Sequence, residues 1–448
     1  MTNLLERFQE YIEQNKLVKE DDKILLTVSG GVDSMVMLNL FAKCGYNIGV
    51  AHCNFQLRGE ESDEDEILVQ KVADSLGVVH YNHRFLTAQE VELSGDSIEM
   101  VARRQRYEWF DAICREHGYT AIAVAHHIDD SIETFFINLF RGTGLKGLTG
   151  IKVQRGKIIR PMIFAQRKDI LEYAANNKVP FREDSSNRST KHLRNKIRLG
   201  LIPRVKEINP KFTSLMRQNI SRLTDAQLFI NSTIARIGEE VISYENGIYQ
   251  LDRDRIEASL PQNFVIYELL NSNFGFKGDV VDSLLASLDC ESSGCRFYSK
   301  EFVAYTNRGM ILITKIPEDD PCEIIVEEHL LRTYCGNSIL FYEHLDIGAL
   351  ETLMAPEKVA LLDADKLKYP LTLRRWREGD YFTPLGMSGR KKVSDFLIDA
   401  KISQPEKERQ FVLLSEGKIV WVVGRRVSEL FKIDDESENI LRITKEIL

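Results

Sequence analysis

Short apolar runs alternate with amphipathic helical patterns along the first two hundred residues. The apolar runs have the length of strands and cover residues 23–29, 47–54, 78–85 and 120–126. Between and after them, apolar positions recur at helical spacing over 35–44, 61–76, 97–117 and 129–140. Strands that alternate with helices of this length are typical of βαβ units. We therefore predict an α/β fold whose first domain is a doubly wound, mostly parallel, Rossmann-like sheet with helices on both faces.

The pattern changes beyond residue 205. Residues 205–245 are helical and polar, which is typical of a linker helix. The next part has a helix-rich stretch at 262–288 and strand-like runs at 296–305 and 310–314, and the chain after Pro356 is again rich in strands. We predict three domains, at residues 1–210, 211–345 and 346–448, of which the second begins with the helical linker and the last two are smaller and mixed α+β.

Composition narrows the class of protein. The chain has 448 residues, of which 43% are hydrophobic and 28% charged, as in globular proteins of more than one domain. No apolar run approaches the roughly 18–20 residues of a membrane span, and the N-terminal residues lack the apolar core of a signal peptide. Seven scattered cysteines do not suggest a disulfide scaffold. These features predict a cytoplasmic protein with no membrane partner; its oligomeric state stays open, with a homodimer as one alternative.

Charge is distributed unevenly along the chain. The net charge is −8, so no global basic field favours nucleic acid. Residues 182–222, however, hold eleven Lys and Arg against three acidic residues, a local charge of +8, and residues 374–392 have a local charge of +4. Two such stretches in an acidic protein favour a polyanionic partner over solvated helix faces.

The first strand–loop–helix carries the most informative motif, the sequence VSGGVDSM at 28–35. A strand ends, a tight Gly-Gly turn follows and a helix begins at once, so backbone N–H groups and the helix N-terminus form an anion site. The alternative is a plain helix cap. Residues 142–147 also match GxGxxG, but they follow a helix, so the dinucleotide interpretation fails in its context. The chain contains no GxxxxGK[ST] motif.

A second polar cluster follows the fourth predicted strand, where open α/β sheets bind ligands. Here the sequence AHHIDDSIET at 125–134 places Asp130 and Glu133 three residues apart, on one face of a helix. This carboxylate pair can bind an ammonium group, a Mg²⁺ ion or both; the alternative is a first turn whose acids favour the helix dipole. His127 orients a phosphate or a substrate, or is a packed histidine.

These segments together resemble a known family. SGGVDS at 29–34 resembles the pyrophosphate loop of the N-type ATP pyrophosphatases, the PP-loop superfamily. Together with further segments, that loop resembles the tRNA(Ile)-lysidine synthetase family. The further segments are AHCNFQLR at 51–58, EMVARRQRY at 99–107, AHHIDDSIET at 125–134, RGTGLKGLTG at 141–150, the basic block at 181–203, and residues 371–404 and 420–433. One departure is Phe55, where the family commonly has histidine in HxNHxLR.

The resemblance implies an ATP-dependent ligase that joins L-lysine to C2 of the wobble cytidine of a CAU-anticodon isoleucine tRNA, through an adenylated cytidine and with Mg²⁺. It implies ATP binding by Ser29, Gly30, Gly31, Val32, Asp33 and Ser34. It implies catalysis by Asp33, His127, Asp130, Glu133 and Arg141, with Asp33 and Asp130 as Mg²⁺ ligands. It implies tRNA binding by Arg103, Arg194, Asn195, Arg198, Arg374, Arg375, Arg377, Arg390, Lys391 and Lys392. The first domain would then be catalytic and the other two would contact tRNA.

Three rival interpretations remain at this point. A tRNA thiolase on the same fold needs a cysteine pair, whereas Cys53 and Cys114 in the first domain are each isolated in the sequence. A small-molecule ligase would not need the basic C-terminal stretch. An inactive, nucleotide-dependent RNA-binding protein would not need to keep the carboxylates of both motifs. For Arg103, an exposed ion-pair face with Glu99 is the alternative to tRNA or ATP binding.

Overall fold

The computed structural model describes residues 3–183, 193–290, 294–307, 309–316, 323–350 and 352–447. The chain forms two compact units, residues 1–230 and 231–448, and each is described by itself. Within the described residues, no helix combines the length and the apolar character needed to cross a bilayer.

The first unit is built on a six-stranded sheet with the order β3-β2-β1-β4-β6-β5. All neighbours are parallel except β5 and β6. The strands are β1 (Ile24–Thr27), β2 (Ile48–Asn54), β3 (Val79–Arg84), β4 (Ala121–Ala123), β5 (Gln154–Arg155) and β6 (Ile158–Ile159). After β3, at one edge of the sheet, the chain crosses over to β4, which lies on the other side of β1. The strand order therefore reverses between β1 and β4, and such a switch point opens a crevice at the carboxyl ends of β1 and β4.

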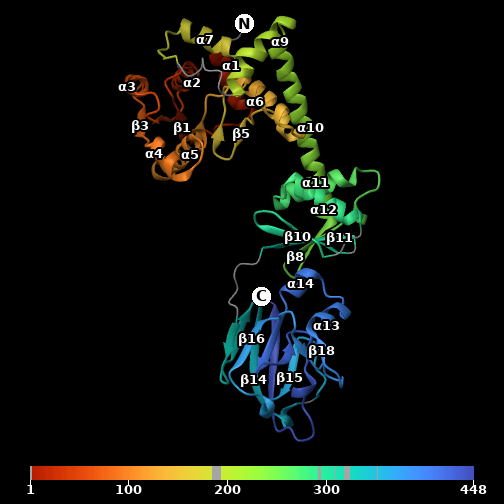
Figure 1. The fold of residues 1–448 in the computed structure, drawn as a ribbon. Coiled ribbons are helices and arrows are strands. Elements are labelled where there is room, and N and C mark those ends of the chain that lie inside the picture. The colour runs from red at the N-terminus through yellow and green to blue at the C-terminus, as the bar shows by residue number, and fades with distance from the viewer. Residues whose placement is uncertain are drawn as a thin grey trace. The chain divides into compact units, whose positions relative to one another are not determined.

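Helices cover both faces of this sheet, as predicted (Figure 1). Ile24 and Leu26 of β1 pack into a core with α1 (Leu4–Gln14), α2 (Val32–Lys43), α3 (Glu60–Ser75) and α7 (Arg167–Asn176). Leu25, which points the other way because side chains alternate along a strand, packs with α5 (Ile98–His117). The shorter α4 (Thr87–Ser94) lies next to α5. The doubly wound α/β prediction is confirmed, and the ends of the predicted elements differ by no more than three residues.

A separate apolar cluster attaches a helical segment to the sheet domain. It joins Ile128 and Ile132 of α6 (Ile128–Arg141) to residues 197–220. That segment comprises α8 (Leu193–Lys196), a π-helix (Ile197–Leu201), α9 (Ile202–Ile208) and the start of α10 (Phe212–Val241), the long helix predicted as a linker. Through this packing the basic stretch lies against α6. Residues 184–192 of that stretch lie outside the described residues.

The second unit begins with a five-stranded sheet of order β7-β8-β11-β10-β9. Its elements are β7 (Ile242–Glu245), β8 (Ile248–Asp252), α11 (Gln262–Phe274), α12 (Gly278–Asp289), β9 (Arg296–Tyr298), β10 (Phe302–Asn307) and β11 (Met310–Lys315). The predicted helix-rich stretch and the strand-like runs at 296–305 and 310–314 are thus confirmed.

The C-terminal part packs two antiparallel sheets around one core that contains the fully buried Trp421. Their orders are β12-β16-β19-β20-β21 and β13-β14-β22-β15. The strands are β12 (Glu323–Val326), β13 (Arg332–Cys335), β14 (Ser338–Asp346), β15 (Val359–Asp363), β16 (Leu371–Arg375), β19 (Phe411–Ser415), β20 (Lys418–Val422), β21 (Arg426–Val427) and β22 (Asn439–Ile447), and a small ribbon pairs β17 (Tyr381–Phe382) with β18 (Lys391–Lys392) ahead of α13 (Val393–Asp399).

The boundary predicted at 345/346 falls inside β14. β14 pairs with β22 along its whole length, and β12 pairs with β16, so the strands before residue 346 complete the C-terminal sheets. We therefore propose that the C-terminal domain begins at β12, near residue 323. The boundary at 210/211 stays a prediction.

Candidate active site

The loop between β1 and α2 folds around its own serines. The backbone N–H of Ser29 donates to Ser34 Oγ over 3.1 Å, and this hydroxyl donates to the Gly31 carbonyl over 2.9 Å. Gly30 has φ +91°, a conformation that favours glycine, and Gly31 is the cap residue of α2. The turn therefore presents the free N–H groups of a helix N-terminus, which attract phosphate.

A buried carboxylate supports this loop from behind. A Cβ added to Gly30 would lie 3.3 Å from the Cβ of Asp65, so only glycine leaves this approach free. Arg182 donates its backbone N–H to the Gly30 carbonyl over 3.0 Å, and its Nε lies 3.1 Å from Asp65 Oδ1. Arg58 binds the other oxygen of Asp65 over 2.9 Å. Asp65 and Arg182 lie outside the loop motif, and sequence reasoning did not assign them to the site. Arg58 ends the segment AHCNFQLR, which contributed to the family resemblance.

The loop borders a cavity of about 490 Å³ at the carboxyl ends of β1, β2 and β4. This volume lies within the range of roughly 300–1,000 Å³ that is typical of small-molecule sites. Its lining includes Ser29, Gly31, Asp33 and Ser34 from the loop, together with His126 and Asp130. The cavity therefore brings the two predicted motifs into one site.

His127 connects the loop to the acidic helix α6. It is 1% exposed, and its Nε2 lies 3.7 Å from Asp33 Oδ1 and 3.5 Å from Asp130 Oδ2. Its backbone N–H donates to Asp130 Oδ2 over 3.0 Å, which caps the helix. Burial acts to raise the pKa of Asp130, but His127, His126 and Arg194 together bring that pKa below its usual range. Asp130 is therefore a fixed anion next to the phosphate loop.

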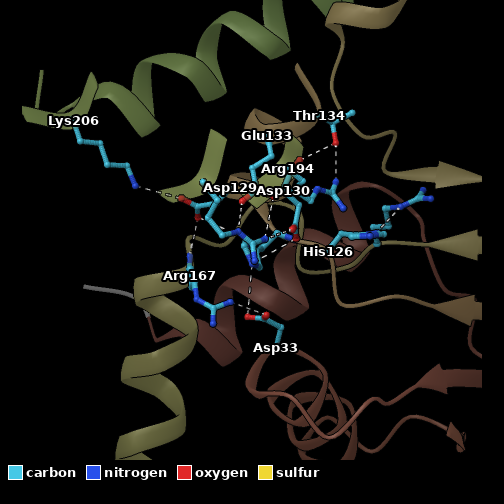
Figure 2. A network of polar contacts seen from close by, with 12 residues as sticks. Asp33, His126, Asp129, Asp130, Glu133, Thr134, Arg167, Arg194 and Lys206 are labelled. Carbon is cyan, nitrogen blue, oxygen red and sulfur yellow. Dashed lines mark hydrogen bonds and ion pairs between the residues drawn. The ribbon is translucent and has the colours of Figure 1, made fainter. Parts of the chain in front are cut away.

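Two arginines of the basic stretch lie on Glu133, as Figure 2 shows for Arg194. Arg198 Nε lies 2.5 Å from Glu133 Oε1, and its Nη2 lies 3.0 Å from Oε2 and 3.3 Å from Asp130 Oδ1. Arg194 Nε lies 3.2 Å from Glu133 Oε2. Burial raises the pKa of Glu133, and these arginines oppose that shift. The structure thus places Arg194 and Arg198, predicted as tRNA contacts, inside the site, and Asn195 lies between them on α8.

Two further cations were missed by sequence reasoning. Arg167, at the start of α7, contacts Asp33 Oδ2 over 3.0 Å and donates its backbone N–H to Asp129 Oδ2 over 3.0 Å (Figure 2). Lys206 Nζ lies 3.5 Å from Asp129 Oδ1. Burial raises the pKa of Asp33, and His127 and Arg167 oppose this shift.

His126 faces the cavity and is held by a buried arginine. Arg160 donates from Nε to His126 Nδ1 over 3.2 Å and from Nη1 to the Lys152 carbonyl over 2.7 Å. Burial and the positive charge of Arg160 lower the pKa of His126 to about 4, against a partial opposing effect of Asp130. Because Nδ1 accepts this hydrogen bond, the neutral ring carries its proton on Nε2. The motif AHHIDD contains His126, but nothing in the motif indicates that Arg160 would hydrogen-bond to this histidine.

The donor set of the site fits Mg²⁺. Asp33 Oδ1 is buried and has no hydrogen-bond partner in the described part of the chain. Within the same part, no group of three or more His, Cys, Asp or Glu side chains is arranged to enclose a metal ion. Mg²⁺ typically uses one or two carboxylates together with substrate phosphates and water, so a single carboxylate beside a phosphate loop suits it.

Of the two remaining predicted residues of the first unit, Arg141 lies away from the site and Arg103 lies in the cavity wall. Arg141 is exposed at the last position of α6, and the helical rise of about 1.5 Å per residue puts it about 16 Å along the axis from Asp130. The structure therefore does not bring Arg141 to the other predicted catalytic residues. Arg103 lines the cavity, where its guanidinium lies 5.0 Å from the centre of the Tyr107 ring.

The second predicted basic surface divides into paired and exposed residues. Arg390 and Lys392 are exposed, and the Arg390 guanidinium lies over the Tyr381 ring at 5.0 Å. Lys391 Nζ lies 2.5 Å from Asp399, and Arg377 lies 3.0 Å from Glu323. Arg375 ends β16 and is partly buried. These positions are compatible with tRNA contact, which stays a prediction.

Arg374 is the exception and corrects the prediction. Its two terminal nitrogens each lie 2.8 Å from an oxygen of Asp380, in a pair whose side chains are 10% and 14% exposed. Hydrogen bonding to Asp380 raises the pKa of Arg374, and the pKa of Asp380 lies below its usual range. A buried guanidinium that forms a bidentate pair with Asp380 is not available to a phosphate, so we assign Arg374 to the structure of the C-terminal domain.

Replacing Arg374 by alanine is therefore expected to lower the stability of this domain by about 3–5 kcal/mol, because it leaves a buried carboxylate unpaired. Arg377→Ala is the matched control, since its exposed pair with Glu323 contributes about 0–1 kcal/mol. Urea denaturation of the full chain, with hydrogen exchange at β16 to locate the transition, measures both. Equal losses for the two variants would contradict the structural role.

Comparison with known families covers most of the chain. A PP-loop domain model matches residues 2–205, a TilS substrate binding domain model matches 244–316, and a TilS substrate C-terminal domain model matches 371–444. Among solved structures, a U34-tRNA thiolase NcsA from Methanococcus maripaludis is similar to 49% of this chain over 79% of its own, at 17% identity and a TM-score of 0.41.

Curated relatives are similar over nearly their whole length. A tRNA(Ile)-lysidine synthase of Parabacteroides distasonis is 37% identical over 436 residues, which are 96% of this chain and 97% of the relative. A tRNA(Ile)-lysidine synthase of Bacteroides thetaiotaomicron is 37% identical over 444 residues, 97% of this chain and 98% of the relative. The aligned regions span nearly the whole of this chain and of each relative.

Proposed function

The chain belongs to the tRNA(Ile)-lysidine synthase family, and from this premise we propose that it ligates L-lysine to the wobble cytidine of a CAU-anticodon isoleucine tRNA. The cytidine C2 oxygen attacks the α-phosphorus of ATP, and pyrophosphate leaves. The lysine ε-amine then attacks C2, loses a proton, and AMP leaves with the former C2 oxygen. The observation that carries this proposal is the cavity that joins the phosphate loop to Asp130 of α6.

Residues 29–34 bind the triphosphate in this proposal. The N–H groups of the loop and of the first turn of α2 orient the phosphates, and positioning accounts for most of the catalysis of a phosphoryl or adenylyl transfer. Asp33, with Asp130 next to it, would hold Mg²⁺, which when bound neutralises phosphate charge. Arg167 holds the Asp33 carboxylate in place by a hydrogen bond to Oδ2 over 3.0 Å.

Asp130 and Glu133 bind an ammonium group of lysine in this proposal. The two guanidinium groups of Arg194 and Arg198 on Glu133 support it, because they indicate that these carboxylates are arranged to accept cationic N–H donors. A carboxylate whose pKa is raised by burial, as for Glu133, is also suited to receive the proton that the attacking amine loses.

A sulfur-transfer function is not favoured. Cys53 lines the cavity, but burial raises the pKa of its thiol to about 12, whereas sulfur chemistry needs a thiolate. Cys114 is a buried residue of α5, and burial raises the pKa of its thiol as well.

The reaction is tested by nucleoside mass analysis. Full-length protein, ATP, Mg²⁺ and lysine are incubated with an unmodified CAU-anticodon isoleucine tRNA, and the tRNA is then digested. A cytidine heavier by one lysine less one water is the expected product. Pyrophosphate release with unchanged cytidine would show that lysine or the tRNA is the wrong substrate, and the absence of both products would contradict the enzyme proposal.

The exposed cations of the C-terminal domain contact tRNA phosphates in this proposal. Arg390→Ala combined with Lys392→Ala is expected to weaken tRNA binding and to reduce the slope of log affinity against log salt by about one to two units, about one for each phosphate that is no longer bound. Titrations at several salt concentrations measure the slope, and Lys418→Ala, an exposed lysine at the start of β20, is the control. An unchanged slope in the double variant would place this ribbon outside the interface.

A further inference from the structure

Two arginines in the cavity wall lack an anionic partner. Arg103 and Arg106 both line the cavity, and in the described part of the chain neither makes a hydrogen bond or an ion pair with another residue. Each lies over an aromatic ring instead, Arg103 over Tyr107 at 5.0 Å and Arg106 over Phe55 at 5.2 Å. By contrast, Arg58 and Arg160 in the same region each bind a protein acceptor. A guanidinium has five N–H donors, so the two cavity arginines present unused donors to a ligand.

The ring beneath Arg106 is held firmly in place. Phe55 stacks on Phe85 with the ring centres 5.2 Å apart and the planes 19° from parallel. Phe85 is 8% exposed and packs edge-on against His83, at 4.4 Å, and Trp109, at 6.0 Å. Phe55 therefore lies under the Arg106 guanidinium, and both side chains line the cavity.

We propose that Phe55 and Arg106 form a stacking wall for a nucleobase in this cavity. The phosphate loop in the same cavity requires a ligand that carries phosphate, and planar guanidinium and aromatic groups are the usual stacking partners of bases in proteins. The family that this sequence resembles commonly has histidine at position 55. Phe55 has no side-chain group that can form a hydrogen bond with a base. The wall therefore recognises the flat face of the base and not its edge.

This inference rests on the proposed function for its two candidate ligands, the adenine of ATP and the wobble cytosine of the tRNA. Both are flat, both reach the α-phosphate during the proposed adenylation, and the wall is suited to either. Adenine and cytosine would stack on the wall by the same chemistry. Separate binding measurements for ATP and for the tRNA stem–loop are therefore used to distinguish them.

The test uses the full chain with Arg106→Lys, which keeps the charge and removes the plane, and with Phe55→Leu, which keeps the apolar volume. Arg104→Lys is the matched control, because Arg104 is on the same helix but is paired with Glu90 and Asp96 outside the cavity wall. Affinities are measured by calorimetry for ATP and for inorganic tripolyphosphate, and by anisotropy for an anticodon stem–loop with cytosine or an abasic site at the wobble position. Thermal melts identify any variant that fails to fold.

If adenine stacks on the wall, both variants lose about fivefold or more in ATP affinity and keep tripolyphosphate affinity. If cytosine stacks there, both variants lose about fivefold or more of the preference for cytosine over the abasic stem–loop. An equal loss for ATP and tripolyphosphate, or no change in either assay, overturns the proposal. Both assays measure binding alone, so a wild-type protein that binds normally but forms no lysidine would contradict the proposed function and not the wall.

Discussion

Asp33→Asn is expected to lower ATP-dependent pyrophosphate release by about a hundredfold or more, while tRNA affinity changes by less than about twofold. The side chain is the only carboxylate in the first turn of α2, and its Oδ1 is buried without a hydrogen-bond partner in the described part of the chain. It lies beside the loop that we propose to hold the triphosphate. Removing a preorganised charge at such a position commonly reduces the rate 10²–10³-fold.

Asp21→Asn is the matched control, because Asp21 is an exposed acid in the turn before β1. Pyrophosphate release is measured with saturating tRNA, and tRNA affinity is measured by filter binding without ATP. Undiminished turnover in Asp33→Asn would remove Asp33 from the site. A parallel loss of tRNA affinity would indicate instead that the variant has disturbed the fold, which thermal melts check.

The parts of the site that the sequence predicted are those formed by local chain geometry. A strand, two glycines and a helix N-terminus within eight residues define the phosphate loop, and the spacing of Asp130 and Glu133 places both on one helical face. Helical spacing also separates Arg141 from Asp130, because a helix over 129–140 puts about three turns between them. The charge of Arg141 and its place beside a glycine motif suggested a role that this distance does not support.

The parts that were missed depend on pairing between distant segments. Arg167 reaches Asp33 across 134 positions of sequence, and Arg182 reaches Asp65 across 117. No periodicity in either segment encodes the contact, because the sheet and its covering helices create it. For Arg374 the sequence predicted too much. A count of charges includes it in a basic surface, whereas in the fold it forms an ion pair with Asp380, only six residues away.

The same limit applies to the C-terminal sheets. β15, β16, β19 and β20 are apolar enough to be recognised as strands, but β13, β14 and β22 alternate with exposed polar residues and were not assigned. Their pairing sets the proposed domain start at β12. The boundary predicted at 345/346 therefore falls inside a strand, since the partner of β14 lies about a hundred residues later.

Glu133→Gln is expected to separate the two chemical steps. The change keeps the shape of a side chain that is 1% exposed and removes the charge that we assign to lysine binding. Pyrophosphate release from ATP and tRNA should persist within about threefold, whereas the KM for lysine should rise about a hundredfold, as expected when a buried charge-assisted hydrogen bond loses its charge. Pyrophosphate and lysidine are measured in the same reactions over a range of lysine concentrations.

The alternative, in which this acid serves Mg²⁺, gives a different result. Loss of Glu133 from a metal site would reduce pyrophosphate release itself, and raising Mg²⁺ would restore it. Arg198→Ala tests how far the loss of the arginine contacts alone explains either result, because the Arg198 guanidinium contacts both Glu133 and Asp130. If Arg198→Ala reproduces the lysine defect of Glu133→Gln in full, the arginine and not the carboxylate governs lysine binding. If it lowers the KM for lysine instead, the guanidinium competes with lysine for the acids of α6.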